Sequence, residues 1–333
     1  MCRATAGAGL GLPLFTSAPK SRIVTVREAG ATEAFQPAPE KVAEMVRRGI
    51  TNFARLPTVK AAWLSLISTQ DTVGIKVFSA PGASVGTRPA VVAAVVEGLL
   101  EAGIATNRIV IWDKLVGDLD VAGFTTLARH YGVRVSGSQA AGYDEQTFYD
   151  KPLVGALTVG DVEFNRKSEG VGRKSFVSKL LVKELTKIIN VAPLLNHNRA
   201  GVSGCLYSLA MGSVDNTVRF EQDAGRLAEA VPEIYALQAV GDKVVLHIVD
   251  ALIAQYEGEQ HTLLHYSAAV NELRFSADPV ALDVLSLREL ELQRQGGKLP
   301  PVASRSVTEL FENAALLELG VNDPHKIQLE TIP

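Results

Sequence analysis

Apolar residues along this chain alternate between short runs typical of buried strands and longer stretches with helical spacing. The short runs predict strands at residues 22–26, 71–78, 108–112, 133–135, 187–191 and 244–249. Helical spacing of apolar side chains predicts helices at 39–56, 88–102, 119–131, 279–295 and 307–319. Because strand, helix and strand follow one another within short spans, right-handed crossovers and a parallel sheet are the default expectation.

Two helix starts carry recognisable capping residues. Thr87 is expected to cap the helix over 88–102, which has a proline in its first turn. Asp278 directly precedes Pro279, a sequence that suits an N-cap followed by proline at the first helical position. Both positions are therefore interpreted as helix boundaries.

The middle of the chain contains the expected irregular segments. Pro193 is expected to end the strand over 187–191, because proline cannot donate to a ladder of hydrogen bonds. Residues 137–151 are expected to form a loop, and 153–164, which alternates around two glycines, a hairpin.

The element order predicts an α/β fold with a mostly parallel or mixed sheet flanked by helices. The chain has 333 residues, of which 47% are hydrophobic, so residues 22–333 can form one large domain or two sublobes, 22–150 and 151–333. Residues 1–21 resemble an export leader whose charged start is nearly missing. The protein is expected in the periplasm if this segment is a truncated signal, and in the cytoplasm if it is a tail.

Composition excludes several classes of partner. Lysine and arginine number 33 and aspartate and glutamate 36, a net charge of 33 − 36 = −3, without a concentrated basic face for nucleic acid. Two cysteines, Cys2 and Cys205, are too few for a disulfide framework or an iron–sulfur site. The apolar runs are too short to span a membrane. A small molecule remains as the expected partner.

The segment after the strand 187–191 is the best candidate for a site, because polar and glycine residues follow a buried strand there. His197 is the candidate acid–base group or ligand, since its ordinary pKa lies near neutrality. A hydrogen-bonded structural histidine is the competing interpretation. The neighbouring residues expected to contact a ligand are Asn196, Asn198, Arg199, Ser203, Gly204 and Tyr207.

Charged residues within or at the ends of other strands supply further candidates. Lys76 lies inside an apolar strand, where an unpaired ammonium is costly. It is expected to contact an anion, to form a structural ion pair, or to extend its ammonium to solvent from an edge strand. Asp113 and Asp250 end two strands and, with His197, could orient a substrate, transfer protons or hold a divalent metal, although no paired-histidine spacing supports a preformed metal site. Asp283 is expected to point back toward the same edge.

Common catalytic motifs are missing from the sequence. The small-residue loop 79–87 precedes a helix, yet it lacks the ending of a Walker loop and the spacing of a dinucleotide fingerprint. Ser203 and Ser208 lack the context of a hydrolase nucleophile. These observations disfavour nucleotide hydrolysis and serine hydrolase chemistry.

Several segments together resemble the domain-of-unknown-function family 362. They are DTVGIKV, TRP at 87–89, IVIWDK, KIINVAPLLNHNRAGVSG, MGSVDNT, HIVDAL and SADPVALD. The resemblance implies that the glycine-rich segment around His197 is a ligand-binding loop. This chain departs from the family at Tyr207-Ser208, where a lysine–asparagine pair is usual, and at Leu195 or Asn196, where a lysine usually precedes the histidine.

A more distant resemblance links the His197 segment to the nickel-pincer lactate racemases. In that family a lysine ten positions beyond the histidine anchors the cofactor, whereas this chain has Tyr207. The resemblance therefore implies a shared fold without the same cofactor linkage. Two functions remain open: an enzyme acting on a small anionic molecule by acid–base or metal-assisted chemistry, and a non-catalytic exported binding protein or degenerate enzyme that has lost the site lysines.

Overall fold

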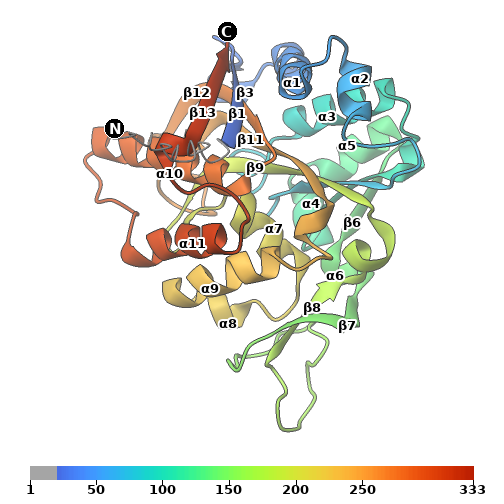
Figure 1. Ribbon diagram of the computed structural model, residues 1–333, viewed down its shortest axis with the longest axis vertical. Helices are drawn as coiled ribbons and strands as arrows, with labels where there is room; N and C mark the ends of the chain where they lie inside the picture. Colours follow the sequence, from blue (N-terminus) through green and yellow to red (C-terminus); the bar gives the residue numbers. More distant parts are fainter. Residues whose placement is uncertain (1–20) are drawn as a thin grey trace, which may run out of the picture.

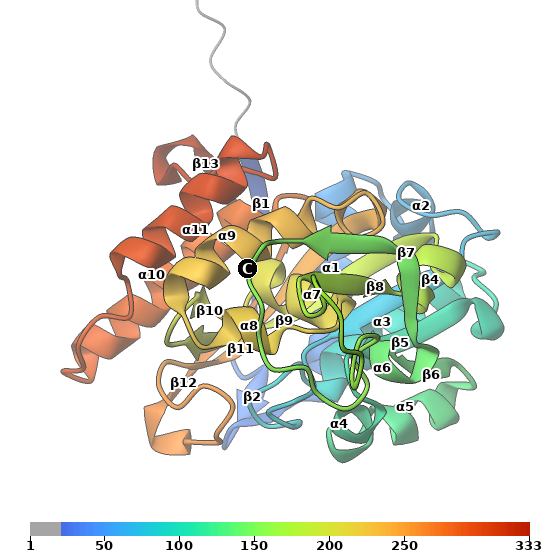
Figure 2. The same cartoon turned by 90° about the horizontal axis from the view of Figure 1, so that it is seen from below.

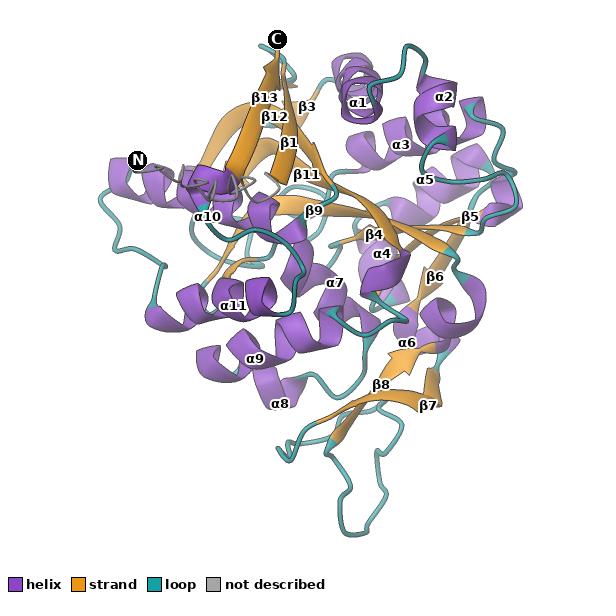
Figure 3. Ribbon diagram, viewed as in Figure 1, coloured by secondary structure: helices purple, strands orange, loops and turns teal. Residues whose placement is uncertain are grey.

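The computed structural model describes residues 21–333, so the leader-like segment and Cys2 lie outside the described residues. A twisted sheet crosses the molecule with helices on both sides (Figures 1 and 3). Its nine strands are β1 (Ser21–Arg27), β4 (Val73–Val77), β5 (Ile109–Asp113), β6 (Arg134–Gly137), β9 (Lys187–His197), β10 (Gly201–Val202), β11 (Val244–Gln255), β12 (Ser267–Ser276) and β13 (Ile327–Ile332).

The strand order is β13-β1-β12-β11-β9-β4-β5-β6, with β10 paired to β9. Strands β11, β9, β4, β5 and β6 are mutually parallel, whereas β12 and β10 run antiparallel to their neighbours. The predicted α/β fold with a mostly parallel sheet is therefore confirmed. Strands from before and after residue 150 share this sheet, and the division into one domain or two sublobes stays a prediction.

One face of the sheet is covered by the helices of the N-terminal part of the chain (Figure 1). Alternate residues of the parallel strands, such as Ile75 and Ile189, pack into this layer. The helices that belong to it are α1 (Pro39–Ala54), α2 (Val59–Leu64), α3 (Pro89–Glu101), α4 (Val116–Val121) and α5 (Phe124–Tyr131).

The opposite face is covered by helices from the second half of the chain. Residues of opposite parity, such as Val110 and Ile188, pack into this second layer. It contains α7 (Cys205–Ser213), α8 (Val218–Glu221), α9 (Ala224–Tyr235), α10 (Pro279–Gly296) and α11 (Arg305–Leu316). The central strands are buried on both faces, which explains their continuous apolar sequences.

Shorter elements complete the described chain. Strands β2 (Thr32–Glu33) and β3 (Gln36–Pro37) form one ribbon, and β7 (Tyr143–Asp150) and β8 (Lys174–Ser178) form another. Figure 2 shows the β7–β8 ribbon and its long loop on the side of the molecule that carries α7 and α8. The remaining turns are α6 (Ser138–Ala141), η1 (Thr106–Arg108), the π-helical η2 (Leu180–Glu184), η3 (Gly241–Lys243), η4 (Leu264–Tyr266) and η5 (Pro324–Lys326). No helix in residues 21–333 has the length and apolar character needed to cross a membrane.

Two predicted strand ends are wrong. Strand β9 continues through Pro193 to His197, because β4 stops pairing with it at Val191 and only β11 and β10 accompany it further. Asp250 does not end its strand, since β11 runs on to Gln255 through a bulge. Proline and a bulge are both tolerated where a ladder is incomplete.

The segment between residues 119 and 164 also differs from its prediction. Gly123, with φ +87°, separates α4 from α5, so the single helix expected over 119–131 is two helices. The loop expected over 137–151 contains α6 and β7, whereas 153–164 forms no strand. The partner of β7 is β8, which comes after that segment, and pairing with a distant partner leaves no local sequence signal.

Thr87 does not cap α3. Its hydroxyl accepts the Phe78 N–H at 2.8 Å and donates to the Val191 carbonyl at 2.6 Å, while Arg88 occupies the N-cap position. Thr87 therefore connects the carboxyl end of β4 to the middle of β9. The cap predicted at Asp278 is confirmed, because its side chain accepts the Ala281 N–H.

Candidate functional site

The chain changes direction across the sheet between β4 and β9. From β4 it winds outward to β5 and β6, and it then returns to place β9 on the other side of β4. In open α/β sheets, ligands bind beyond the carboxyl ends of strands at such a switch point. A ligand site is therefore expected at this edge of the sheet.

Lys76 forms an ion pair with Asp113. The Lys76 Nζ lies 2.8 Å from Asp113 Oδ1 and also donates to the Val77 carbonyl at 2.6 Å. The second carboxylate oxygen of Asp113 accepts both the N–H and the hydroxyl of Ser79 at 2.7 Å. Burial lowers the pKa of the Lys76 ammonium, and the charge of Asp113 opposes this shift.

Helix α7 covers this ion pair. Gly212 lies so close that a Cβ there would come within 2.5 Å of Lys76 Cε, and the Lys76 side chain is fully buried. The glycine therefore permits close packing of α7 on the pair. The charge of Lys76 is met inside the protein, which matches the structural alternative stated for it.

Asp250 lies on the other face of the sheet. In β11, Ile248 and Leu252 pack into the N-terminal helical layer, and Asp250, two positions from each, points to the same face. In β4, Ile75 and Val77 point to that face, so Lys76 between them points to the face that α7 covers. Its carboxylate accepts the Arg88 backbone N–H at 2.9 Å and pairs with the Arg88 guanidinium at 3.0 Å. The four proposed catalytic residues therefore do not surround one pocket.

His197, the last residue of β9, lies against Tyr207 of α7, with ring centroids 4.3 Å apart. Its Nδ1 accepts the Ala200 N–H at 3.0 Å and the Arg199 N–H at 3.3 Å. These two donors require an unprotonated Nδ1, so the neutral ring carries its proton on Nε2. Burial lowers the pKa of His197, which also favours this neutral form.

This tautomer limits what His197 can do. Its Nε2–H is a hydrogen-bond donor and has no partner among residues 21–333. The same nitrogen has no free lone pair for a base or a metal ligand. The Tyr207 hydroxyl likewise makes no hydrogen bond within the described chain, and burial raises its pKa, so it too remains a donor.

The other polar residues of this turn mostly hold it together. Asn196 donates to the Asn198 side chain at 3.1 Å, and both residues are bonded to Glu259. Arg199 is exposed beside the His197–Tyr207 pair. The buried Ser203 hydroxyl has no hydrogen-bond partner within residues 21–333.

Asp283 lies at the start of α7. Its two carboxylate oxygens accept the backbone N–H groups of Cys205 and Leu206 at 2.6 and 2.9 Å. A Cβ on Gly204 would meet Asp283 Oδ1 at 2.1 Å, so only glycine fits beside this carboxylate. Burial raises the pKa of Asp283 to about 7, against the lowering effect of these hydrogen bonds. Asp283 thus caps the helix that carries Tyr207.

A buried polar cluster beneath α7 was not among the predicted site residues. His247 is bonded to Asn190 Nδ2 through Nδ1 at 3.2 Å and to the Tyr235 hydroxyl through Nε2 at 2.9 Å. Asn190 also donates to the Cys205 carbonyl at 3.0 Å. The hydrogen-bond partners of His247 come from distant positions in the sequence. The one sequence signal for this cluster was therefore a polar residue, His247, within an otherwise apolar strand.

His247 should make the protein sensitive to acid. Burial lowers its pKa from 6.5 to about 3, so between these values the unfolded chain binds the proton more readily than the folded chain. The contribution of His247 to the free energy of unfolding is therefore fully present above pH 6.5. It decreases by up to about 1.4 kcal/mol per pH unit as the pH drops toward 3. The measurement is urea unfolding of wild type and His247→Asn between pH 4 and 8.

The comparison with His247→Asn isolates this effect from Asp215 and Asp283. Burial raises the pKa of Asp215 to about 6 and that of Asp283 to about 7. The folded protein therefore binds protons at these two groups more readily than the unfolded chain, and their contribution to its stability increases as the pH falls. They are present in both proteins and cancel in the difference. We expect the variant to lose less stability than wild type at pH 4; parallel pH profiles would contradict the assignment.

The charged residues of the described part of the chain supply no ready metal site. Within residues 21–333 there is no group of three or more histidine, cysteine, aspartate or glutamate side chains placed to hold a metal ion. Lys76 is paired with Asp113, and the Nδ1 of His197 is occupied by backbone donors.

Fold and edge together define an α/β protein of mostly parallel sheet, with Lys76 and Asp113 paired where β4 and β5 end. The family described as Domain of unknown function (DUF362) matches residues 73–288, and the chain belongs to this family. The matched region contains Lys76, Asp113, His197, Asp250 and Asp283. The comparisons give no support to a likeness to nickel-pincer lactate racemases.

Among solved structures, one similar chain is a protein from Thermotoga maritima determined by the Northeast Structural Genomics Consortium. It is 13% identical over 80% of this chain and 61% of the other, with a TM-score of 0.40. This chain thus spans less than two thirds of that protein's length. No curated protein matches the sequence.

Proposed function

We propose that the protein binds a small anionic molecule at the carboxyl end of β9, with His197 and Tyr207 as hydrogen-bond donors. The observation that carries this proposal is the pairing of two nearly buried rings, 4.3 Å apart, whose Nε2–H and hydroxyl have no partner within residues 21–333. Neither atom is among the fully buried side-chain atoms that have no partner, so both donors reach solvent and can meet an acceptor-rich ligand. The adjacent Arg199 adds positive charge that attracts a carboxylate or phosphate.

An enzymatic role for this site would use donation rather than proton abstraction by His197. A neutral imidazole and a phenol aimed at one oxygen stabilise negative charge that develops on a bound carbonyl or carboxylate. Lys76 and Asp113 would act from beneath α7 by fixing the helix that carries Tyr207. Asp250 would act only by anchoring Arg88 at the start of α3.

The site is tested by removing each donor while keeping its surroundings. In His197→Asn, the amide oxygen can replace Nδ1 as acceptor of the turn, but the Nε2–H is lost. In Tyr207→Phe, only the hydroxyl is lost. Malonate, citrate and inorganic phosphate serve as ligands, and their apparent affinities are obtained from thermal stabilisation. We expect each variant to bind them at least tenfold more weakly than wild type, because a lost charge-assisted hydrogen bond costs about 1.5–3 kcal/mol.

The matched control is His130→Asn. His130 is an exposed histidine that also contacts a tyrosine ring, at 4.8 Å, and it lies away from β9 on α5. Its replacement should leave ligand-induced stabilisation unchanged. Equal affinities for the ligands in wild type, His197→Asn and Tyr207→Phe would refute the proposal.

A second candidate is binding without catalysis. It is favoured by Lys76, whose charge is met by Asp113 under α7, and by Tyr207, which stands where the family usually has a lysine. A ligand that stabilises the protein and is recovered chemically unchanged after prolonged incubation, as measured by NMR, supports binding alone. Conversion of the ligand that is lost in Tyr207→Phe supports the enzyme.

A further inference from the structure

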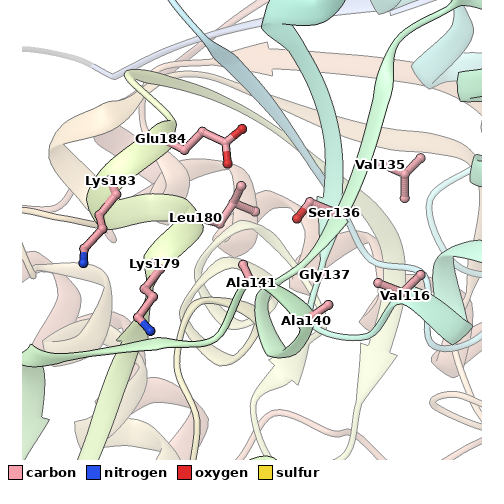
Figure 4. A pocket seen from close by; sticks show the side chains of 10 residues that line it. All are labelled: Val116, Val135, Ser136, Gly137, Ala140, Ala141, Lys179, Leu180, Lys183 and Glu184. Atoms are coloured by element: carbon pink, nitrogen blue, oxygen red, sulfur yellow. The ribbon is translucent and has the colours of Figure 1, made fainter.

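A hollow lies beside β6, the edge strand of the sheet (Figure 4). It has a volume of about 380 Å³ and is bounded by β6, α6 and the π-helical turn η2. Gly137, Ala140 and Ala141 line one side, and Leu180 projects from the turn toward Ser136. Small-molecule sites commonly begin at about this volume and combine an apolar lining with a few polar groups.

Two lysines mark the rim of this hollow. Lys179 has no acidic side chain within 4.0 Å among residues 21–333, and Lys183 lies 3.6 Å from Asp144 Oδ1. Both also line a neighbouring hollow of about 440 Å³, and their side chains extend outward from the turn, away from Leu180 and Ser136 (Figure 4). The one carboxylate on the rim, Glu184, is paired with Arg134. An excess of positive charge therefore remains beside an apolar lining.

The backbone that carries these lysines is held in place. The Leu185 N–H donates to the Leu180 carbonyl at 2.9 Å, the i to i+5 bond that defines a π turn. The Lys179 N–H donates to the Gly142 carbonyl at 2.8 Å, and Gly142 has φ +74°, which suits glycine. Such π turns are frequent at functional sites.

We propose that this hollow binds a small organic anion, with its carboxylate between Lys179 and Lys183 and its short apolar body against Leu180, Ala140 and Ala141. The positive rim selects the charge, and the lining selects an apolar group instead of a fully hydrated ion. The proposal is independent of the His197 site, because β6 is separated from β9 by β5 and β4.

The test uses hexanoate as ligand and isothermal titration calorimetry as readout. Wild type should bind hexanoate saturably, and the double variant Lys179→Ala/Lys183→Ala should bind it at least tenfold more weakly. Ala140→Phe should weaken it similarly, because Ala140 is exposed and lines the hollow, so a phenyl ring would fill the space without disturbing the core. Hexylammonium, with the opposite charge, should not bind.

The control Lys60→Ala/Lys326→Ala removes two exposed lysines elsewhere and should leave the affinity unchanged. The His197→Asn variant should also bind hexanoate as wild type does, which separates this site from the one at β9. Absence of saturable binding overturns the proposal. So does binding that inorganic phosphate displaces at equal concentration and that Ala140→Phe leaves intact, because this would be ion association with surface lysines alone.

Discussion

Replacing Lys76 with methionine is expected to lower the free energy of unfolding by about 3–5 kcal/mol. The variant leaves the Asp113 carboxylate under α7 without its cation, and a buried charge without a partner is costly. The two hydrogen bonds from Ser79 remain and keep the loss from being larger. Urea unfolding at neutral pH, followed by circular dichroism, measures the change.

Two further proteins separate the ion pair from a general effect of losing a lysine. In Lys76→Met/Asp113→Asn neither charge remains, so most of the lost stability should return. In Lys151→Met the partly exposed pairs with Glu229 and Glu233 are lost, and the change should stay below about 1 kcal/mol. If Lys76→Met unfolds at the same urea concentration as wild type, the pair is not structural and the lysine is free for another role.

Replacing Gly204 with alanine is expected to destabilise the protein by about 3 kcal/mol, since it combines overpacking with loss of a helix cap. The new Cβ would lie 2.1 Å from Asp283 Oδ1, so the carboxylate must move away from the N–H groups of Cys205 and Leu206. Movement of α7 would displace Tyr207 as well. Ligand-induced stabilisation at the β9 site should therefore fall together with the melting temperature.

The control for this substitution is Gly117→Ala. Gly117 lies in α4, and a Cβ there meets no atom within 4 Å, so the change should be neutral or stabilise by up to about 1 kcal/mol. Addition of Asp283→Ala to Gly204→Ala removes the collision, and the two losses should not add. Additive losses would show that Gly204 and Asp283 act independently.

Much of the architecture was predictable because it depends on local patterns. The continuous β-branched run at 187–191 indicates a strand buried on both faces. The helical spacing over 39–56 indicates a helix buried on one face. Both patterns are formed by residues that are close together in the sequence. Asp278 before Pro279 predicted its cap correctly, since a cap involves only residues within one turn.

The errors arose where a distant partner decided the local structure. Thr87 looks like a cap in sequence, but its hydroxyl is used by Phe78 and Val191, which the fold brings to it. Pro193 looks like a strand end, but β9 continues because β4 has already ended beside it. Neither circumstance leaves a signal in the residues nearby.

For the candidate site, the sequence determined which groups are present: a lysine in a buried strand, two aspartates after apolar runs and a histidine among glycines. Only the tertiary structure decided which of them meet. Strand parity places Asp250 on the opposite face from Lys76, and the turn after His197 directs two backbone N–H groups to its Nδ1. The physical reason is that charge pairing and tautomer depend on atoms a few ångströms away in space, whatever their separation along the chain.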